Sequence, residues 1–228
     1  MYKSMLFLHW KQVRPGLALA VVAAFGLPIM AVEGLGTPVG MDTASMDAYR
    51  FIAAFESWLP LFPLLALGIG VTMALSAWNW DHQQKHVYAL SLPMTRWEYT
   101  LQKLLAGMTL CVVPAAAMWV GSHVAAASID LPTGLNAYPN EVSVRFLFAI
   151  LISYAVWFAF ASGTIRTAAW VFGVVGSFFF FGMIVNDILA NYFVFFQQVV
   201  VVEEVIDWLM NAPGPFEVYS GNWSLIDV

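Results

Sequence analysis

Residues 79–107 read NWDHQQKHVYALSLPMTRWEYTLQKLLAG and form the one long charged segment between two strongly apolar runs. Thr95 and Glu98 stand three apart at the start of the second run. This is the spacing of a capping box, in which a hydroxyl and a carboxylate satisfy free amides of the first helical turn. Pro93 has no amide hydrogen and restricts Leu92 before it. The segment therefore predicts a turn at Pro93 and a new helix from about Thr95.

The composition of the whole chain is that of a membrane protein. Of its 228 residues, 61% are hydrophobic and 10% are charged, and the mean hydropathy is +0.76. Soluble domains carry about a quarter charged residues. Five apolar runs each approach the length that crosses about 30 Å of hydrocarbon as a helix. We expect an all-α polytopic transmembrane helix bundle in a single domain, residues 1–228, with spans at 16–32, 57–78, 104–125, 146–163 and 168–185.

The segment before the first span is amphipathic. Within residues 1–15, apolar side chains recur at helical spacing on one side, and basic residues lie elsewhere. This pattern favours an interfacial helix at the membrane surface, although the frayed start of the first span is an alternative. Pro28 and Pro114 fall inside spans and predict kinks there. The apolar side of the interfacial helix is formed by Tyr2, Met5, Leu6, Trp10 and Val13.

The segment after the fifth span, residues 186–228, is harder to assign. Its apolar part is interrupted by Asn191, Gln197 and Gln198 and is followed by acidic residues without a Lys or Arg. We expect an external amphipathic or re-entrant segment before a sixth span that is missing. The chain is then either truncated or a five-span variant, and residues 221–228 could be the approach to that span.

Charge placement predicts the orientation. If the N-terminus is cytoplasmic, seven of the nine Lys and Arg residues lie inside, which is a clear positive-inside bias. The loop at 79–98 is then cytoplasmic. We expect a multi-pass protein of a bacterial-type plasma membrane. The inside residues are Lys3, Lys11, Arg14, Lys85, Arg96, Lys103 and Arg166.

The sequence gives little support for nucleotide binding by a phosphate-binding loop, for ion-driven transport or for a zinc site. No Gly-x-x-x-x-Gly-Lys-Ser/Thr sequence occurs, so the chain has no phosphate-binding loop of that type. The predicted spans hold no acidic residue, and Lys103 lies near an edge where it can snorkel, which argues against an ion-driven carrier. His82 and His86 stand four apart, but a polar helix end explains them better than a zinc site. We expect no enzymatic activity, no cofactor and no nucleic-acid partner.

Residues 90–99, LSLPMTRWEY, followed by KLLAG at 103–107, resemble a pattern in the permease subunits of type 2 ABC exporters. In that family the pattern lies in a cytoplasmic loop between the second and third spans. The resemblance implies an ATP-driven export function, a partner ATP-binding subunit and a second permease subunit that completes a homo- or heterodimer. The transported substrate is not specified by any of these residues.

The resemblance also implies which residues couple the chain to its ATP-binding partner. They belong to the loop at 79–98, which would transmit movement into the second and third spans. The alternative function is a non-transport membrane protein, either an assembly factor or an intramembrane enzyme. The expected coupling residues are His86, Tyr88, Leu92, Pro93, Thr95, Arg96 and Glu98.

Overall fold

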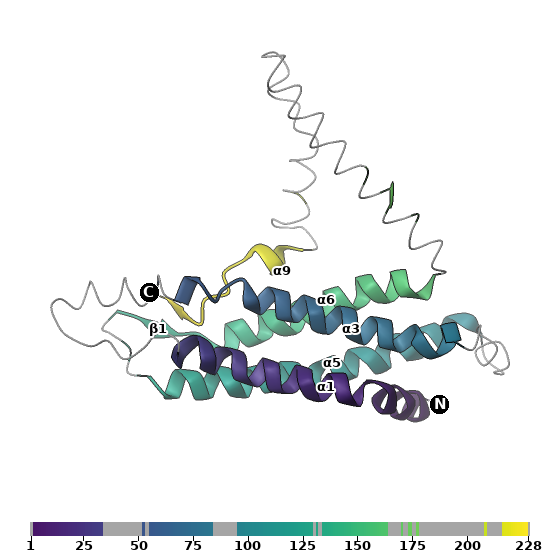
Figure 1. Ribbon diagram of the computed structural model, residues 1–228, viewed down its shortest axis with the longest axis horizontal. Helices are drawn as coiled ribbons and strands as arrows, with labels where there is room; N and C mark the ends of the chain where they lie inside the picture. The colour runs from purple at the N-terminus through teal and green to yellow at the C-terminus, as the bar shows by residue number, and fades with distance from the viewer. Residues whose placement is uncertain are drawn as a thin grey trace, which may run out of the picture. The chain divides into compact units, whose positions relative to one another are not determined.

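A computed structural model shows a mainly helical chain (Figure 1). It describes residues 2–33, 52, 55–83, 95–129, 131, 134–163, 170, 173–174, 177, 208 and 216–227. The chain divides into two compact units, one of residues 1–158 with 222–228 and the other of residues 159–221. The first unit contains the helix bundle.

Four described helices are long and apolar enough to cross a membrane. They correspond to the first four predicted spans, and each is longer than expected. Of the predicted fifth span, only Trp170, Gly173, Val174 and Ser177 are described, all helical. Of the external segment predicted at 186–228, only Trp208 and residues 216–227 are described. The four helices are α1 (Tyr2–Glu33), α3 (Leu61–Gln83), α5 (Arg96–Ala127) and α6 (Pro139–Ser162).

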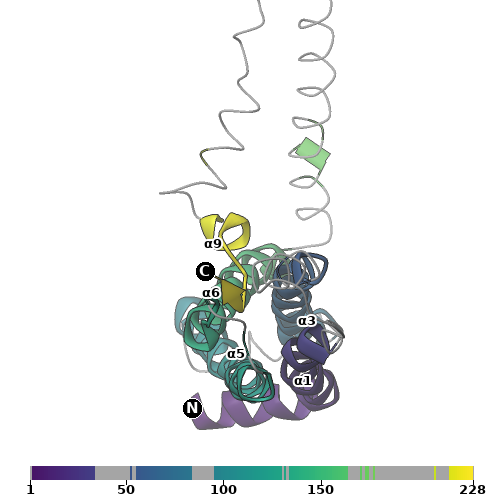
Figure 2. The ribbon, with the colours of Figure 1, turned by 90° about the vertical axis from the view of Figure 1, so that its left-hand side faces the viewer.

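Helix α1 joins the predicted interfacial helix and the first span into one element. Its N-terminal part, in purple, runs across the end of the bundle, whereas the remainder runs along it (Figure 2). Pro15 and Pro28 lie inside this helix, and proline favours a bend because it removes one backbone hydrogen bond. Of the residues expected on the apolar side, Met5 and Val13 are buried in the bundle, whereas Tyr2 and Trp10 are exposed. The side of the helix that is buried in the bundle carries Met5, His9, Val13 and Leu17.

The helices pack closely through small residues. A side chain at Gly121 on α5 would meet the backbone of Phe25 on α1. A side chain at Gly70 on α3 would meet Ser153 on α6, whose hydroxyl donates to the Leu67 carbonyl at 3.0 Å. Small residues and interhelical hydrogen bonds replace the hydrophobic effect as the source of helix association in lipid.

Helix α6 begins earlier than predicted. It starts at Pro139 instead of residue 146, so Arg145 lies within the helix and not in the loop before it. Proline suits the first helical position, where its missing amide hydrogen is not needed, and Glu141 in the first turn is favourable to the helix dipole. The polar character of these residues hid the helix start from a search for apolar runs.

A small sheet closes the end of the bundle opposite the N-terminus (Figure 1). Strand β1 (Asn136–Ala137), between α5 and α6, pairs antiparallel with β2 (Ile226–Asp227). Trp223 and Leu225 are buried beside this sheet. Residues 222–227 are therefore a docked strand with its lead-in. A short helix, α9 (Glu217–Ser220), belongs to the second unit.

Candidate functional site

The predicted helix start in the charged segment is confirmed. Thr95 is the N-cap of α5, and its hydroxyl accepts a hydrogen bond from the Glu98 amide at 3.3 Å. The Glu98 carboxylate in turn accepts from the Thr95 amide at 3.1 Å. Both halves of the capping box are thus present, and Glu98 has a structural role.

The structure describes three of the seven predicted coupling residues. Thr95, Arg96 and Glu98 are all exposed on the first turn of α5. Trp97 between them is 71% exposed. The other predicted coupling residues lie outside the described part of the chain; they are His86, Tyr88, Leu92 and Pro93.

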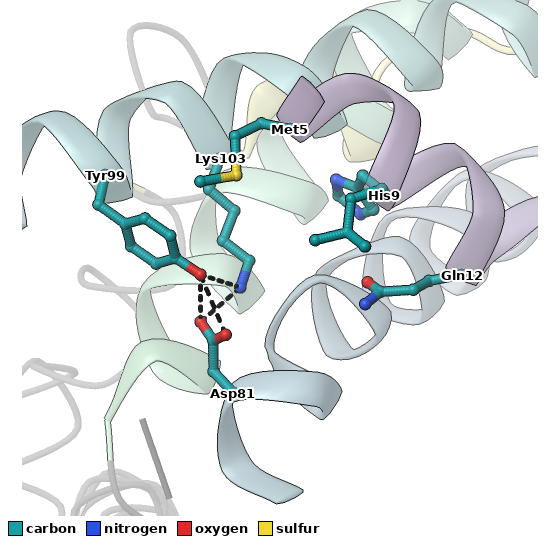
Figure 3. A pocket seen from close by; sticks show the side chains of 7 residues that line it. Met5, His9, Gln12, Asp81, Tyr99 and Lys103 are labelled. Atoms are coloured by element: carbon teal, nitrogen blue, oxygen red, sulfur yellow. Dashed lines mark hydrogen bonds and ion pairs between the residues drawn. The ribbon is translucent and has the colours of Figure 1, made fainter. Parts of the chain in front are cut away.

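A buried ion pair joins α3 to α5, the two helices that flank residues 84–94. The Lys103 ammonium lies 2.6 Å from the Asp81 carboxylate, and these residues are only 8% and 1% exposed. The Tyr99 hydroxyl lies within hydrogen-bonding distance of both carboxylate oxygens, at 3.0 and 2.9 Å, and donates to that group. Figure 3 shows the three side chains meeting. We call His9, Asp81, Tyr99 and Lys103 the polar cluster.

The environment of Lys103 overturns two sequence predictions. Its ammonium does not snorkel to a membrane edge; it lies over the Trp78 ring, 4.5 Å from the ring centre, and pairs with Asp81. Asp81 was predicted to lie beyond the end of the second span at residue 78. Because α3 continues to Gln83, this acid is buried inside an apolar helix instead. A buried acid of this kind is costly unless it is paired, as Asp81 is with Lys103.

The ion pair has a mechanical consequence for the segment between the helices. Asp81 lies in the last turn of α3, and Tyr99 and Lys103 lie in the first turns of α5. Breaking one partner of a buried pair leaves an uncompensated charge, which costs about 3–5 kcal/mol. Residues 84–94 therefore connect two helix ends that are held together.

His9 completes the polar cluster from α1. Its side chain is 4% exposed, and neither ring nitrogen makes a hydrogen bond of normal geometry among the described residues. The ring lies in the field of the Lys103 ammonium and near the Met73 backbone on α3. A side chain at Gly107 on α5 would meet both the His9 ring and the Tyr154 hydroxyl. The missing side chain at Gly107 is what allows His9 to approach α5.

A small cavity lies between His9 and the ion pair, with a volume of about 10 Å³. Figure 3 shows His9 and Gln12 on α1 across from Lys103 on α5 and Asp81 on α3. Three helices thus contribute polar groups to one small, partly open pocket. The lining residues are Met5, Leu8, His9, Gln12, Asp81, Tyr99 and Lys103.

Sequence reasoning missed the polar cluster, although its helical spacing was visible. His9 lies between Met5 and Val13 at intervals of four, in the middle of the buried side of α1. Tyr99 and Lys103 are also four apart and share one face of α5. A polar residue within a buried stripe, when matched with opposite charges on neighbouring helices, is the signal that could have found this site.

The remaining histidines form no metal centre in the described part of the chain. No group of three or more His, Cys, Asp or Glu side chains there is arranged to hold an ion. His82 is exposed and lies near Trp78, with 6.5 Å between the ring centres, and His86 lies outside the described residues. His123 contacts the carbonyl and ring of Trp119.

Comparisons of the chain with protein-family models, curated proteins and solved structures find no match. Any functional conclusion therefore depends on the residues and geometry described above.

Proposed function

We propose that this chain is the membrane-spanning subunit of an ATP-driven exporter, moved by a separate ATP-binding subunit that contacts the segment between α3 and α5. The proposal begins from the resemblance of residues 90–107 to permease subunits of type 2 ABC exporters. The strongest structural support is the arrangement of the segment between α3 and α5. Arg96 and Trp97 are exposed beside a fixed helix start, and the two flanking helices are joined by a buried ion pair.

This arrangement of a fixed helix start and an ion pair suits the transmission of force from a partner to the helices. A partner that pushes on the exposed first turn of α5 acts on a helix whose start is held by the capping box. The Asp81–Lys103 pair passes the displacement to α3, so both helices move together. The proposed role of Arg96 is direct contact with the partner, whereas Thr95 and Glu98 maintain the helix start.

The strand pairing supports five crossings. Four crossings by α1, α3, α5 and α6 return the chain at Ser162 to the side from which it began. Strand β2, however, pairs with β1 at the opposite side of the bundle. One more crossing within residues 163–221 reconciles these observations, in the region where the apolar run at 168–185 predicts the fifth span.

Cysteine accessibility tests this orientation. The single natural cysteine, Cys111, is buried, so an introduced thiol is the reactive one. We expect Asn222→Cys to react with a membrane-impermeant maleimide on whole cells, and Trp97→Cys to react only after permeabilisation. Labelling of Trp97→Cys from outside would overturn the proposal, because no ATP-binding subunit could reach this turn.

The coupling role is tested by site-specific photocrosslinking in native membranes. A crosslinker at Trp97 should capture a protein that carries a phosphate-binding loop, and one at Val144, exposed at the other end of the bundle, should not. Arg96→Glu should lower co-purification of that protein at least several-fold, whereas Arg96→Lys should retain most of it. Unchanged co-purification and transport with Arg96→Glu would contradict the proposed contact.

The buried Asp81 favours a second candidate, an ion-coupled carrier. Proton and ion pathways commonly use acids within spans. The test is a rapid pH jump on proteoliposomes that contain this chain alone. A charge movement that is lost in Asp81→Asn supports the carrier, and no movement supports a dependent subunit. If neither coupling nor a partner is found, the chain is a non-transport membrane protein.

A further inference from the structure

We propose that the cavity between His9 and the Asp81–Lys103 pair binds one water molecule, which links α1 to α3 and α5 through hydrogen bonds. The site depends on the geometry of the bundle and is independent of the exporter proposal. Its ligand is neutral water, and its walls come from three helices.

The first argument is the hydrogen-bonding capacity of His9. A neutral imidazole has one N–H donor and one acceptor nitrogen. Both nitrogens are buried and neither makes a hydrogen bond of normal geometry among the described residues, although the Met73 backbone lies near the ring; the side chain is 4% exposed. Buried polar groups in native proteins are almost always satisfied, often by an ordered water. His9 therefore calls for a polar ligand within the cavity that it lines.

The second argument is the hydrogen-bond donor capacity of Lys103. Its ammonium has three N–H groups. Asp81 accepts one at 2.6 Å, and the Tyr99 hydroxyl lies 3.5 Å away, at the limit of a hydrogen bond. Donor capacity therefore remains for a water, which can donate to the acceptor nitrogen of His9. The Gln12 amide in the same wall offers a further partner.

The third argument is size and charge. A volume of about 10 Å³ is close to the space that a single water needs, and too small for a larger polar ligand. The charges of Asp81 and Lys103 cancel, so the site has no net charge to attract an ion. A cation would also meet the Lys103 ammonium, and an anion would meet the Asp81 carboxylate. A neutral molecule fits both conditions.

The bound water would give the N-terminal part of α1 a polar attachment to the bundle. Without it, this part is held by packing of Met5 and Val13 and by a 2.7 Å hydrogen bond between the Tyr2 hydroxyl and Thr109. With it, His9 becomes a positioning residue that connects α1 to the ion pair. The ends of α1, α3 and α5 then move as one hydrogen-bonded unit.

X-ray radiolytic labelling of the full-length protein in detergent tests the water directly, because radicals formed from bound water oxidise the side chains beside it. A bulk scavenger removes labelling by solvent. We expect oxidation of Met5, which lines the cavity, and little oxidation of Met118, which is buried elsewhere on α5. His9→Leu should reduce Met5 oxidation at least several-fold. Equal, low oxidation of Met5 and Met118 in the natural sequence would overturn the proposal.

Thermal unfolding is an independent test, because a bound water and a dry cavity predict different changes in the Tm of His9→Leu. If the water is bound, His9→Leu removes its partner and should lower the Tm by at least about 2–4 °C, while His9→Gln, which keeps a donor and an acceptor, should lower it less. If the cavity is dry, His9→Leu removes two buried nitrogens without a hydrogen bond of normal geometry and should leave the Tm unchanged or raise it. That second outcome contradicts the proposal. Labelling of the natural sequence decides the question even if a variant fails to fold.

Discussion

The two ends of the helix bundle are built in opposite ways. At the N-terminal end, three helices meet through the polar cluster, in which a buried ion pair and a histidine replace apolar packing. At the other end, buried Trp223 and Leu225 lie beside a two-stranded sheet, in which Ile226 of β2 is also buried. Figure 1 shows this sheet at the end remote from the N-terminus.

The difference indicates where function is to be sought. A buried ion pair is seldom the most stable solution, because desolvation of two charges offsets their attraction, and well-packed apolar residues often do as well. The end of the bundle that carries the two-stranded sheet, called the strand end below, is packed with apolar residues instead. The polar cluster therefore points to positioning or function, and the exposed turn with Arg96 and Trp97 lies at the same end of α5.

The largest expected effect is the loss of one partner of the ion pair. Asp81→Ala leaves the Lys103 ammonium buried and unpaired, which should lower the free energy of unfolding by about 3–5 kcal/mol. Detergent-solubilised protein followed by circular dichroism measures this. Glu56→Ala, which removes an exposed acid, should change it by less than about 0.5 kcal/mol. The double variant Asp81→Ala, Lys103→Met should regain much of the loss; no recovery would contradict the assigned pairing.

The matching change at the strand end is Leu225→Ala. Leu225 is fully buried, so truncation creates a cavity and should cost about 2–5 kcal/mol. Leu225→Met keeps the volume and should cost less than about 1.5 kcal/mol. Thermal unfolding in detergent compares the two. Equal stability of Leu225→Ala and the natural sequence would mean that the strand end does not close the bundle.

A third change probes the contact between α1 and α5. Gly121→Ala places a methyl group against the Phe25 backbone, which cannot move aside, and should cost about 1–3 kcal/mol. Gly16→Ala is the matched control, because nothing lies within 4 Å of the added atom, and it should be neutral or slightly stabilising. Similar Tm values for the two variants would show that the helices are not in close contact.

The smallest expected effect is at the cap. Thr95→Ala removes the acceptor for the Glu98 amide and should cost about 1 kcal/mol, and Thr95→Ser should restore most of it. Hydrogen exchange at the first turn of α5 reports this local change more directly than global unfolding. Unchanged exchange in Thr95→Ala would contradict the role of the capping box.

The parts of the fold that depend on neighbouring residues in sequence were predictable. The capping box at Thr95 required only the spacing of a hydroxyl and a carboxylate, and the first four spans required only long apolar runs. The start of α6 at Pro139 was missed because its first turns are polar, although proline and an acid are themselves signals of a helix start.

The candidate site was predictable only in part. The exposure of Arg96 follows from its place beside a cap, but the pairing of Asp81 with Lys103 depends on how α3 lies against α5. The same holds for His9, whose ring reaches the ion pair only because α1 bends and Gly107 leaves room. Spacing within one helix does not specify which face of another helix it meets.

Sequence by itself determined the class of this protein, its helical elements and the cap at Thr95, because hydropathy and hydrogen bonding within one turn are local properties. Only the tertiary structure decided that Lys103 is paired and buried, and that β2 returns to β1. Those contacts join residues that are distant along the chain. Their free energy depends on burial and distance, and both exist only once the helices have packed.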